Sequence, residues 1–138
     1  MKPLIFLFIF FSFNNSKLFC VENLITEKYW RLIELNNKEI VKTKSPQKEI
    51  YMILKEDGKI IGFSGCNSFQ GEYHTDMENR LKINNLITTR MMCPEINLEN
   101  IFTKRLGETE KFHYRNDTLT IFNLDSLKLA KFKCIYLR

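Results

Sequence analysis

The sequence predicts an α+β fold, in which a curved antiparallel β-sheet carries one helix packed across it. Two observations lead to this prediction. Short runs with an apolar residue at every second position fill most of residues 28–138, and turn-forming pairs separate them. One segment, residues 94–106, has its apolar residues at helical spacing instead. No repeat, low-complexity tract or linker divides residues 28–138, so we expect a single domain there.

Residues 1–20 have the pattern of a secretory signal peptide. Lys2 precedes the apolar run Leu4–Phe13, which is too short for a bilayer that takes roughly 20 residues to cross. We therefore exclude residues 1–20 from the fold and expect export, without a transmembrane segment in the mature chain. The segment before Cys20, Lys17–Phe19, is a poor lipobox. Cleavage after Cys20 and a lipid anchor on Cys20 are both kept as alternatives, as is a buried N-terminal element.

The strands follow from alternation and turn residues. Residues 28–35 form the first, with Trp30, Leu32 and Glu34 on one face, and the polar residues 36–48 form a loop. The pair Asp57-Gly58 favours a two-residue hairpin, because both turn positions need positive φ. The strand segments that follow the loop are 49–55, 59–66, 71–76, 80–89 and three more within 111–137, divided at Asn116-Asp117 and Asp125-Ser126.

The helix is predicted over Pro94–Leu106. Its ends agree with the helix dipole, since acidic residues lie near the start and basic residues near the end, and Gly107 follows as a left-handed cap. The apolar stripe comprises Leu98, Ile101, Phe102 and Leu106, the acidic residues are Glu95 and Glu99, and the basic residues are Lys104 and Arg105. The core predicted to join sheet and helix consists of Trp30, Leu32, Ile53, Phe69, Tyr73, Ile83, Phe102 and Leu106.

Charge argues against nucleic-acid binding. Removing residues 1–20 leaves 19 basic and 16 acidic residues, a net charge of +3, and the two signs alternate along the chain. A nucleic-acid site needs basic residues clustered on one face. The richest basic stretch, with Lys128, Lys131 and Lys133, fits the solvent-facing positions of an edge strand, where lysine prevents aggregation.

The residues that carry chemistry do not form a catalytic pattern. The two histidines, His74 and His113, are expected on outward strand faces, away from a cysteine that a base would activate. The cysteines and histidines lack the close pairs of a zinc site. The run Met91-Met92-Cys93 is compatible with a soft metal, but we expect these methionines to fill a core. We expect no enzyme activity and no cofactor.

Several pieces together resemble the META domain family, to which HslJ-like heat-shock proteins belong. They are "YWRL" at 29–32, "ILKEDGKIIGFSG" at 53–65, "GCNSFQGEY" at 65–73, "LKINNLITTRMMC" at 81–93, and Glu99. The resemblance covers nearly all of residues 28–138. It implies a small secreted or envelope domain, often a lipoprotein, associated with heat shock, stress or antibiotic tolerance and secretion, and it brings no accepted catalytic residue. The motif residues are Trp30, Gly65, Cys66, Asn67, Phe69, Gly71, Tyr73, Thr89, Met91, Cys93 and Glu99.

The glycine-rich motif is interpreted as a structural turn, with a ligand-binding turn as the alternative. Gly62, Gly65 and Gly71 punctuate a strand–turn–strand unit. Asn67 is expected either in a left-handed conformation or capping exposed amides with its side chain. Phe69 and Tyr73 share the core face, with the tyrosine hydroxyl at its edge.

Cys66 and Cys93 are predicted to form a disulfide. Export brings the chain into oxidising conditions, and both cysteines lie in the family motifs at strand ends. Cys134 is then a buried free thiol. The alternative leaves all three cysteines reduced.

Two classes of function follow. The first is a non-enzymatic envelope domain that supports stress tolerance by binding a partner protein or small ligand, or by supporting envelope integrity. The second is a thiol-redox or soft-metal-binding envelope protein that uses Cys66 and Cys93.

The signal sequence gives the first testable prediction. N-terminal sequencing of the protein recovered from cells should find a chain that begins near Val21, or a lipidated Cys20, because the apolar run is removed on export. Recovery of the cytosolic protein with Met1 in place would contradict it.

Overall fold

The structure is a computed structural model that describes residues 22–41, 48–94 and 96–136. The predicted signal peptide and Cys20 lie outside these residues. The elements in chain order are α1 (Glu22–Ile25), β1 (Tyr29–Leu35), β2 (Lys38–Glu39), β3 (Tyr51–Leu54), β4 (Lys59–Phe63), β5 (Ser68–Thr75), β6 (Leu81–Thr88), α2 (Ile96–Gly107), β7 (Lys111–Arg115), β8 (Thr118–Phe122) and β9 (Lys128–Ile135).

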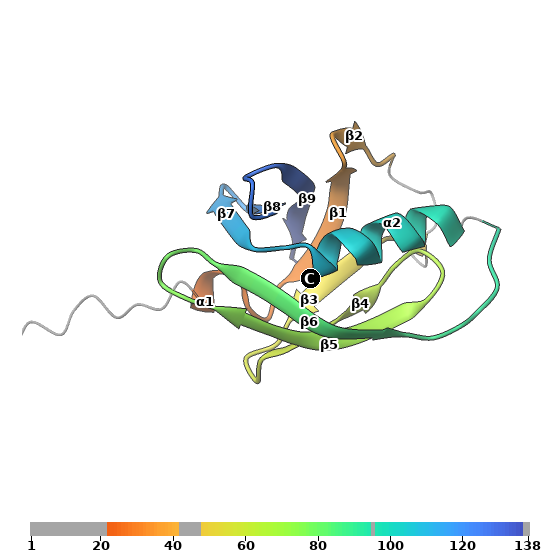
Figure 1. The fold of residues 1–138 in the computed structure, drawn as a ribbon, viewed down its shortest axis with the longest axis horizontal. Coiled ribbons are helices and arrows are strands. Elements are labelled where there is room, and N and C mark those ends of the chain that lie inside the picture. Colours follow the sequence, from red (N-terminus) through yellow and green to blue (C-terminus); the bar gives the residue numbers. More distant parts are fainter. Residues whose placement is uncertain (1–21, 42–47, 95, 137–138) are drawn as a thin grey trace, which may run out of the picture.

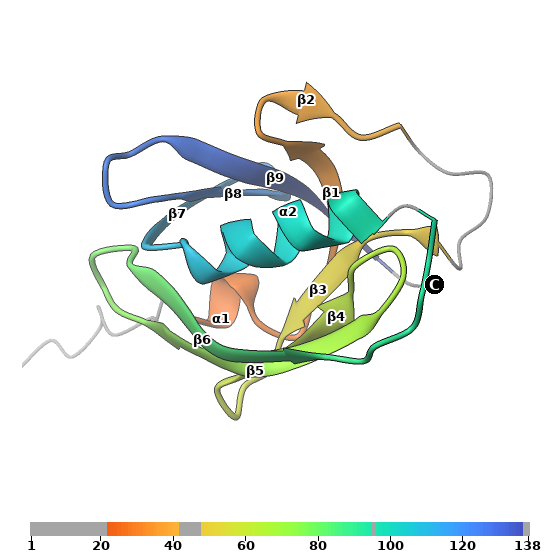
Figure 2. The same ribbon diagram turned by 45° about the vertical axis from the view of Figure 1, so that its right-hand side comes forward.

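All the strands belong to one antiparallel sheet, in the order β6-β5-β4-β3-β1-β9-β8-β7, with β2 paired to β1. The sheet curls so that its edge strands approach each other at the start of β6, where the Leu81 amide donates to the Glu110 carbonyl at 3.0 Å. Helix α2 lies across the opening of this half-barrel (Figures 1 and 2). The predicted fold class is therefore confirmed. No helix in the described part of the chain has the length and apolar character to span a membrane.

Strand β1 departs from strict alternation. Its pairing with β9 shifts register between Leu32 and Glu34. A bulge of this kind adds one residue and changes which side chain faces the core. Trp30, Leu32 and Leu35 are buried, whereas Glu34 was wrongly predicted on their face. Glu34 instead forms an ion pair with Lys128, whose ammonium holds the pKa of this carboxyl below its usual value.

The hairpins follow the asparagine and glycine positions. Asn116 and Asp117 both have positive φ, 50° and 57°, and form the expected two-residue turn between β7 and β8. The prediction for Asp57-Gly58 was wrong in detail. Leu54 pairs with Ile60 and the Lys55 amide donates to the Lys59 carbonyl at 2.7 Å, so the turn has one residue more, and within it only Gly58 has positive φ, 81°.

The helix begins later than predicted and presents a different stripe. Its buried residues are Glu99, Phe102 and Leu106, while Ile101 is 41% exposed, contrary to expectation. The Glu99 carboxylate points inward because the side-chain amide of Asn67 donates hydrogen bonds to it there. Gly107 is the last helical residue and does not have positive φ. The expected left-handed cap is therefore absent. Instead, the Glu108 amide donates to the Lys104 carbonyl at 3.1 Å and the Thr109 amide donates to the Leu106 carbonyl at 3.2 Å.

The core fills the space between the concave face of the sheet and α2. The rings of Phe69 and Phe132 lie 5.8 and 6.2 Å from that of Phe102, and the Trp30 indole donates to the Ile25 carbonyl at 2.8 Å. Seven of the eight predicted core residues are buried; Ile53 is only half-buried. The alternation of β3 directs Met52 and Leu54 inward instead, so the prediction for Ile53 was shifted by one residue.

Strand β9 is not the exposed edge that its lysines indicated. It lies between β1 and β8 in the sheet. Lys128 and Lys131 both pair with Glu34, and the Lys133 ammonium donates to the Asn116 carbonyl at 3.0 Å. These lysines therefore serve local ion pairs and a turn on the outer face rather than protecting a free edge.

Phe102→Ala should lower the free energy of unfolding by about 3–5 kcal/mol, because it removes a fully buried ring that contacts two others. Ile101→Ala is the matched control on the same helix, with an expected cost within about 0.5 kcal/mol. Chemical denaturation measures both. Equal costs for the two variants would contradict the observed orientation of α2.

Candidate functional site

The motif that begins at Gly65 forms the turn between β4 and β5. Gly65 has a φ of +97°, and the amide and hydroxyl of Ser64 each donate to the Asn67 carbonyl at 2.8 Å. A left-handed residue at this place favours glycine. The turn directs the side chains of Cys66 and Asn67 toward the connection between β6 and α2.

The side-chain amide of Asn67 joins that connection to the helix. Its Oδ1 accepts from the Thr89 hydroxyl at 2.8 Å and from the Met91 amide at 2.7 Å. Its Nδ2 donates to both oxygens of the Glu99 carboxylate at 2.9 Å. The Met91 backbone amide only donates, so the Asn67 atom that faces it is the oxygen and the atom that faces Glu99 is the nitrogen. Of the two roles considered for Asn67, the structure confirms capping by the side chain.

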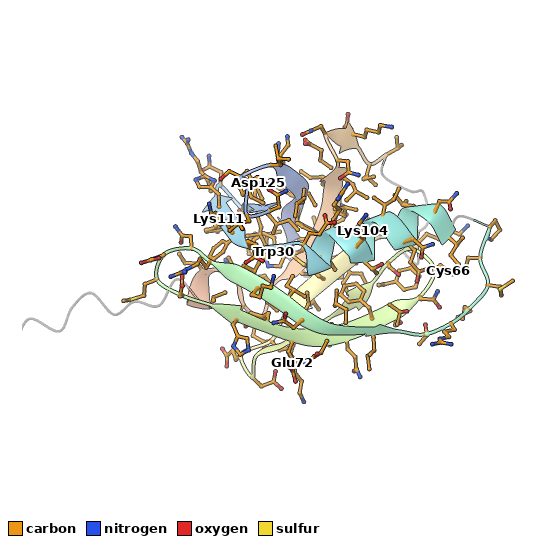
Figure 3. The ribbon with its side chains drawn as sticks, in the orientation of Figure 1. Trp30, Cys66, Glu72, Lys104, Lys111 and Asp125 are labelled. Carbon is orange, nitrogen blue, oxygen red and sulfur yellow. A yellow bond between two sulfur atoms is a disulfide. The ribbon has the colours of Figure 1, made fainter. Side chains whose placement is uncertain are left out.

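Cys66 and Cys93 form the predicted disulfide, with α-carbons 6.0 Å apart. Cys66 is 8% exposed and Cys93 is half-buried. Cys134 is buried on β9 outside any disulfide, as predicted. Figure 3 shows Cys66 close to the N-terminal end of α2. The disulfide and Asn67 therefore attach the same connection to the same turn.

A cavity of about 600 Å³ lies beside the disulfide. One wall is the sheet and the segment before β3, and the facing wall is the disulfide with the start of α2. The lining is predominantly apolar, with charged residues of both signs. The apolar lining residues are Leu32, Ile33, Ile40, Val41, Ile50, Pro94 and Leu98, together with Gly65 and the two cysteines; the charged ones are Arg31, Glu39, Lys48 and Glu49.

The charged side of the cavity is partly neutralised. Arg31 Nη1 lies 3.5 Å from Glu49 Oε1, with both side chains mostly buried. Next to this pair, partial burial and the negative charge of Glu49 raise the pKa of Tyr29 to about 12. Tyr29 stacks on Tyr51 with ring centroids 4.4 Å apart. Tyr29 thus stays neutral at physiological pH, and the site offers an apolar volume with an ion pair at its side.

The family motif divides into two groups in space. Seven of its residues meet at the disulfide and Asn67, whereas the other four belong to the sheet and core. The first group is Gly65, Cys66, Asn67, Thr89, Met91, Cys93 and Glu99. In the second group, Trp30, Phe69 and Tyr73 are buried, and a Cβ on Gly71 would lie 2.8 Å from the Asn84 carbonyl oxygen. The Tyr73 hydroxyl donates to the Lys55 carbonyl at 2.6 Å, at the predicted core edge.

The sequence interpretation missed the cavity. Ile33, Ile40 and Ile50 carry no shared spacing. Backbone hydrogen bonds from the Ile40 amide to the Ile33 carbonyl and from the Leu32 amide to the Ile50 carbonyl, both 2.9 Å, bring them together. Leu98 was predicted in the helical stripe and is half-buried at the cavity. The available sequence signal for the cavity was Leu98, an apolar residue of the predicted helix that follows Cys93 closely.

The methionines were wrongly predicted as core residues. Met91 is 64% and Met92 96% exposed, because Asn67 holds the backbone of Met91 while the side chains project outward. With Cys66 and Cys93 oxidised, neither sulfur is a thiolate ligand. The described residues contain no cluster of three or more metal-binding side chains. His74 and His113 are exposed on their strands, as expected.

Asn67→Ala should destabilise the protein by about 3 kcal/mol, because it leaves the Met91 amide and the buried Glu99 carboxylate without their partner. The matched control is Asn97, which is exposed on α2, the helix that carries Glu99. Asn97→Ala should change stability by about 0.5 kcal/mol or less.

A double-mutant cycle with Glu99→Ala tests the coupling directly. The double variant should be less destabilised than the sum of the two single variants, by about 1–2 kcal/mol, since no unpartnered carboxylate is left. Additive costs in chemical denaturation would show that Asn67 and Glu99 act independently.

Comparison with solved structures supports the fold. A protein from Burkholderia xenovorans solved by NMR is 20% identical, covers 84% of this chain and 87% of its own, and has a TM-score of 0.63. A second NMR structure is 28% identical, with 81% and 92% coverage and a TM-score of 0.61. The crystal structure of a DUF4847 family protein from Bacteroides vulgatus is 16% identical, with 82% and 96% coverage and a TM-score of 0.60.

No protein among the curated ones matches the chain. The META domain model, by contrast, matches residues 22–133, which contain the sheet through most of β9, the helix, and both halves of the disulfide. The resemblance in the motifs is thereby confirmed. The chain belongs to the META domain family.

Proposed function

We propose that this protein is an exported, non-enzymatic META domain of the periplasm or cell envelope that supports stress tolerance by binding a ligand or partner in the cavity beside the disulfide. The observation that carries the proposal is the cavity itself. A volume of about 600 Å³ with a mainly apolar lining and a few charged groups fits the usual form of a small-ligand site.

The partly exposed apolar side chains beside the cavity support a ligand-binding site rather than a filled part of the core. Leu32 and Ile50 are buried behind it, while Leu98 and Ile40 are only partly buried and pack against the core from its side. Filling this volume with an apolar group removes more of that surface from water, which favours association by roughly 25 cal/mol per Å² before the entropic costs of binding.

The disulfide supports the proposed location. Disulfides persist in oxidising compartments and are rare in the cytosol. Cys66–Cys93 encloses the edge strand β6 and its neighbour β5. The signal-like residues 1–20 agree with export.

A thiol-redox protein is the second candidate. One observation favours it: Cys93 is only half-buried, so its end of the disulfide is less enclosed than the end at the buried Cys66. Exchange with thiols requires such access. The soft-metal form of this alternative requires the reduced cysteines as ligands.

Leu98→Trp tests the cavity as a binding site. The larger side chain fills the volume from α2, so the affinity of an apolar fluorescent probe, 1-anilinonaphthalene-8-sulfonate, should fall at least tenfold. Ile101→Trp, on the exposed side of the same helix, should leave affinity within about twofold of the wild type. Fluorescence titration gives the affinities, and amide shifts in NMR locate the probe. Equal affinity in Leu98→Trp and wild type, or shifts confined to another face, would contradict the proposal.

A further inference from the structure

We propose that the Cys66–Cys93 disulfide is a redox gate on the cavity. Its reduction releases residues 92–94 and loosens the wall at the start of α2, while Asn67 keeps residues 89–91 on the sheet. The effect on binding rests on the proposed function, but the opening itself does not.

The connection between β6 and α2 has two kinds of attachment. Its first half is held by hydrogen bonds: the Thr89 amide donates to the Ser68 carbonyl at 3.0 Å, and Asn67 Oδ1 accepts from the Thr89 hydroxyl and the Met91 amide. Its second half is held by the disulfide. Among the described residues, no hydrogen bond joins Met92, Cys93 or Pro94 to the sheet.

The covalently held half forms the cavity wall. Cys93 and Pro94 line the cavity, and Leu98 follows them on the first turns of α2. On the opposite side, Cys66 and Gly65 belong to a turn that Ser64 closes with two hydrogen bonds to the Asn67 carbonyl. Loss of the disulfide therefore frees the helix side of the cavity and leaves the sheet side intact.

The retained hydrogen bonds make the opening local and reversible. Strands β5 and β6 pair from Phe69–Thr88 to Thr75–Leu81 without help from the disulfide, and Glu99 stays bonded to Asn67. Cys93 consequently remains within a short tether of Cys66, so that reoxidation restores the same pair. Phe102 and Leu106, deeper along α2, keep the rest of the helix in the core.

The exchange step requires a dithiol as reductant. Its thiolate attacks the sulfur of Cys93, which is more accessible than the 8% exposed Cys66, and the Cys66 thiolate leaves. The second thiol of the reductant then displaces Cys93 from the mixed disulfide, and both leaving thiolates take up protons. Two electrons pass to the protein, which becomes a dithiol, and the reductant becomes a disulfide.

The test uses the protein expressed from its full coding sequence and purified without reductant. It is titrated with dithiothreitol, trapped with iodoacetamide and mapped by peptide mass. We expect Cys66 and Cys93 to be alkylated together while the buried Cys134 stays protected. Hydrogen-exchange mass spectrometry of the two redox states should then show at least tenfold faster exchange at residues 100–102, the amides of α2 that donate to the carbonyls of residues 96–98, with less than twofold change in β5 and β6.

The probe of the cavity, 1-anilinonaphthalene-8-sulfonate, should bind the two states with affinities that differ at least threefold. Alkylation of all three cysteines together with fast exchange throughout the chain would overturn the gate, because the disulfide would then hold the whole fold. Unchanged exchange at residues 100–102 would also overturn it. Faster exchange there without probe binding to either state would support the opening and overturn the binding site proposed above.

Two variants separate the tethers. Cys66→Ser/Cys93→Ser should reproduce the reduced state without reductant, and Cys134→Ser, which leaves the disulfide intact, should behave as the oxidised wild type. Thr89→Val removes two hydrogen bonds of the first half, the one from the Thr89 hydroxyl to Asn67 Oδ1 and the one from the Ser68 amide to that hydroxyl. Reduction of this variant should extend fast exchange to residues 89–91. Fast exchange that stays confined to residues 100–102 in reduced Thr89→Val would overturn the role assigned to the Asn67 tether.

Discussion

The arrangement depends on one carboxamide. The side chain of Asn67 joins the β4–β5 turn, the connection after β6 and helix α2 through hydrogen bonds to Met91, Thr89 and Glu99. A carboxylate buried on the core side of a helix is costly unless it is bonded, and here its partner comes from a turn that only a left-handed Gly65 permits. The inward position of Glu99 also sets the rotation of α2 about its axis, which places Phe102 and Leu106 in the core and Ile101 in solvent.

The disulfide adds to this junction without duplicating it. Asn67 acts before Met92 and Cys93 acts after it, so the chain crosses from sheet to helix under two successive constraints. Between them Met91 and Met92 project into solvent. Exposure of this pair forgoes the stabilisation that burial would bring, because the two constraints keep the side chains out of the core. The methionine pair is thus a consequence of how the connection is fixed, which composition alone did not reveal.

Alternation predicted most of the fold because its period depends on local geometry: Leu81 and Ile83, or Phe69 and Tyr73, share a face wherever the strand pairs. The predictions failed where the position of a residue or strand depends on a partner that is distant in the sequence. The bulge at Glu34, the inner position of β9 and the inward Glu99 all depend on pairing or packing partners that are distant in sequence. The disulfide was predicted from the oxidising compartment and from the position of both cysteines in the family motifs, at predicted strand ends. The cavity was not predicted, because its walls come from separate segments and no local sequence pattern indicates that these segments meet.

The position of the cavity follows from how each part of α2 is held on the sheet. Where sheet and helix are joined by packing, as around Trp30 and Phe102, the interior is filled and the side chains have little freedom. At the end of α2 near the disulfide, the helix is held by bonds to a turn instead of by side-chain volume, so the space between Leu98 and Ile50 does not have to be filled for the helix to stay in place. A junction made of an amide and a disulfide keeps a cavity open at low cost in packing. That property suits a domain whose activity, as proposed, is to bind rather than to catalyse.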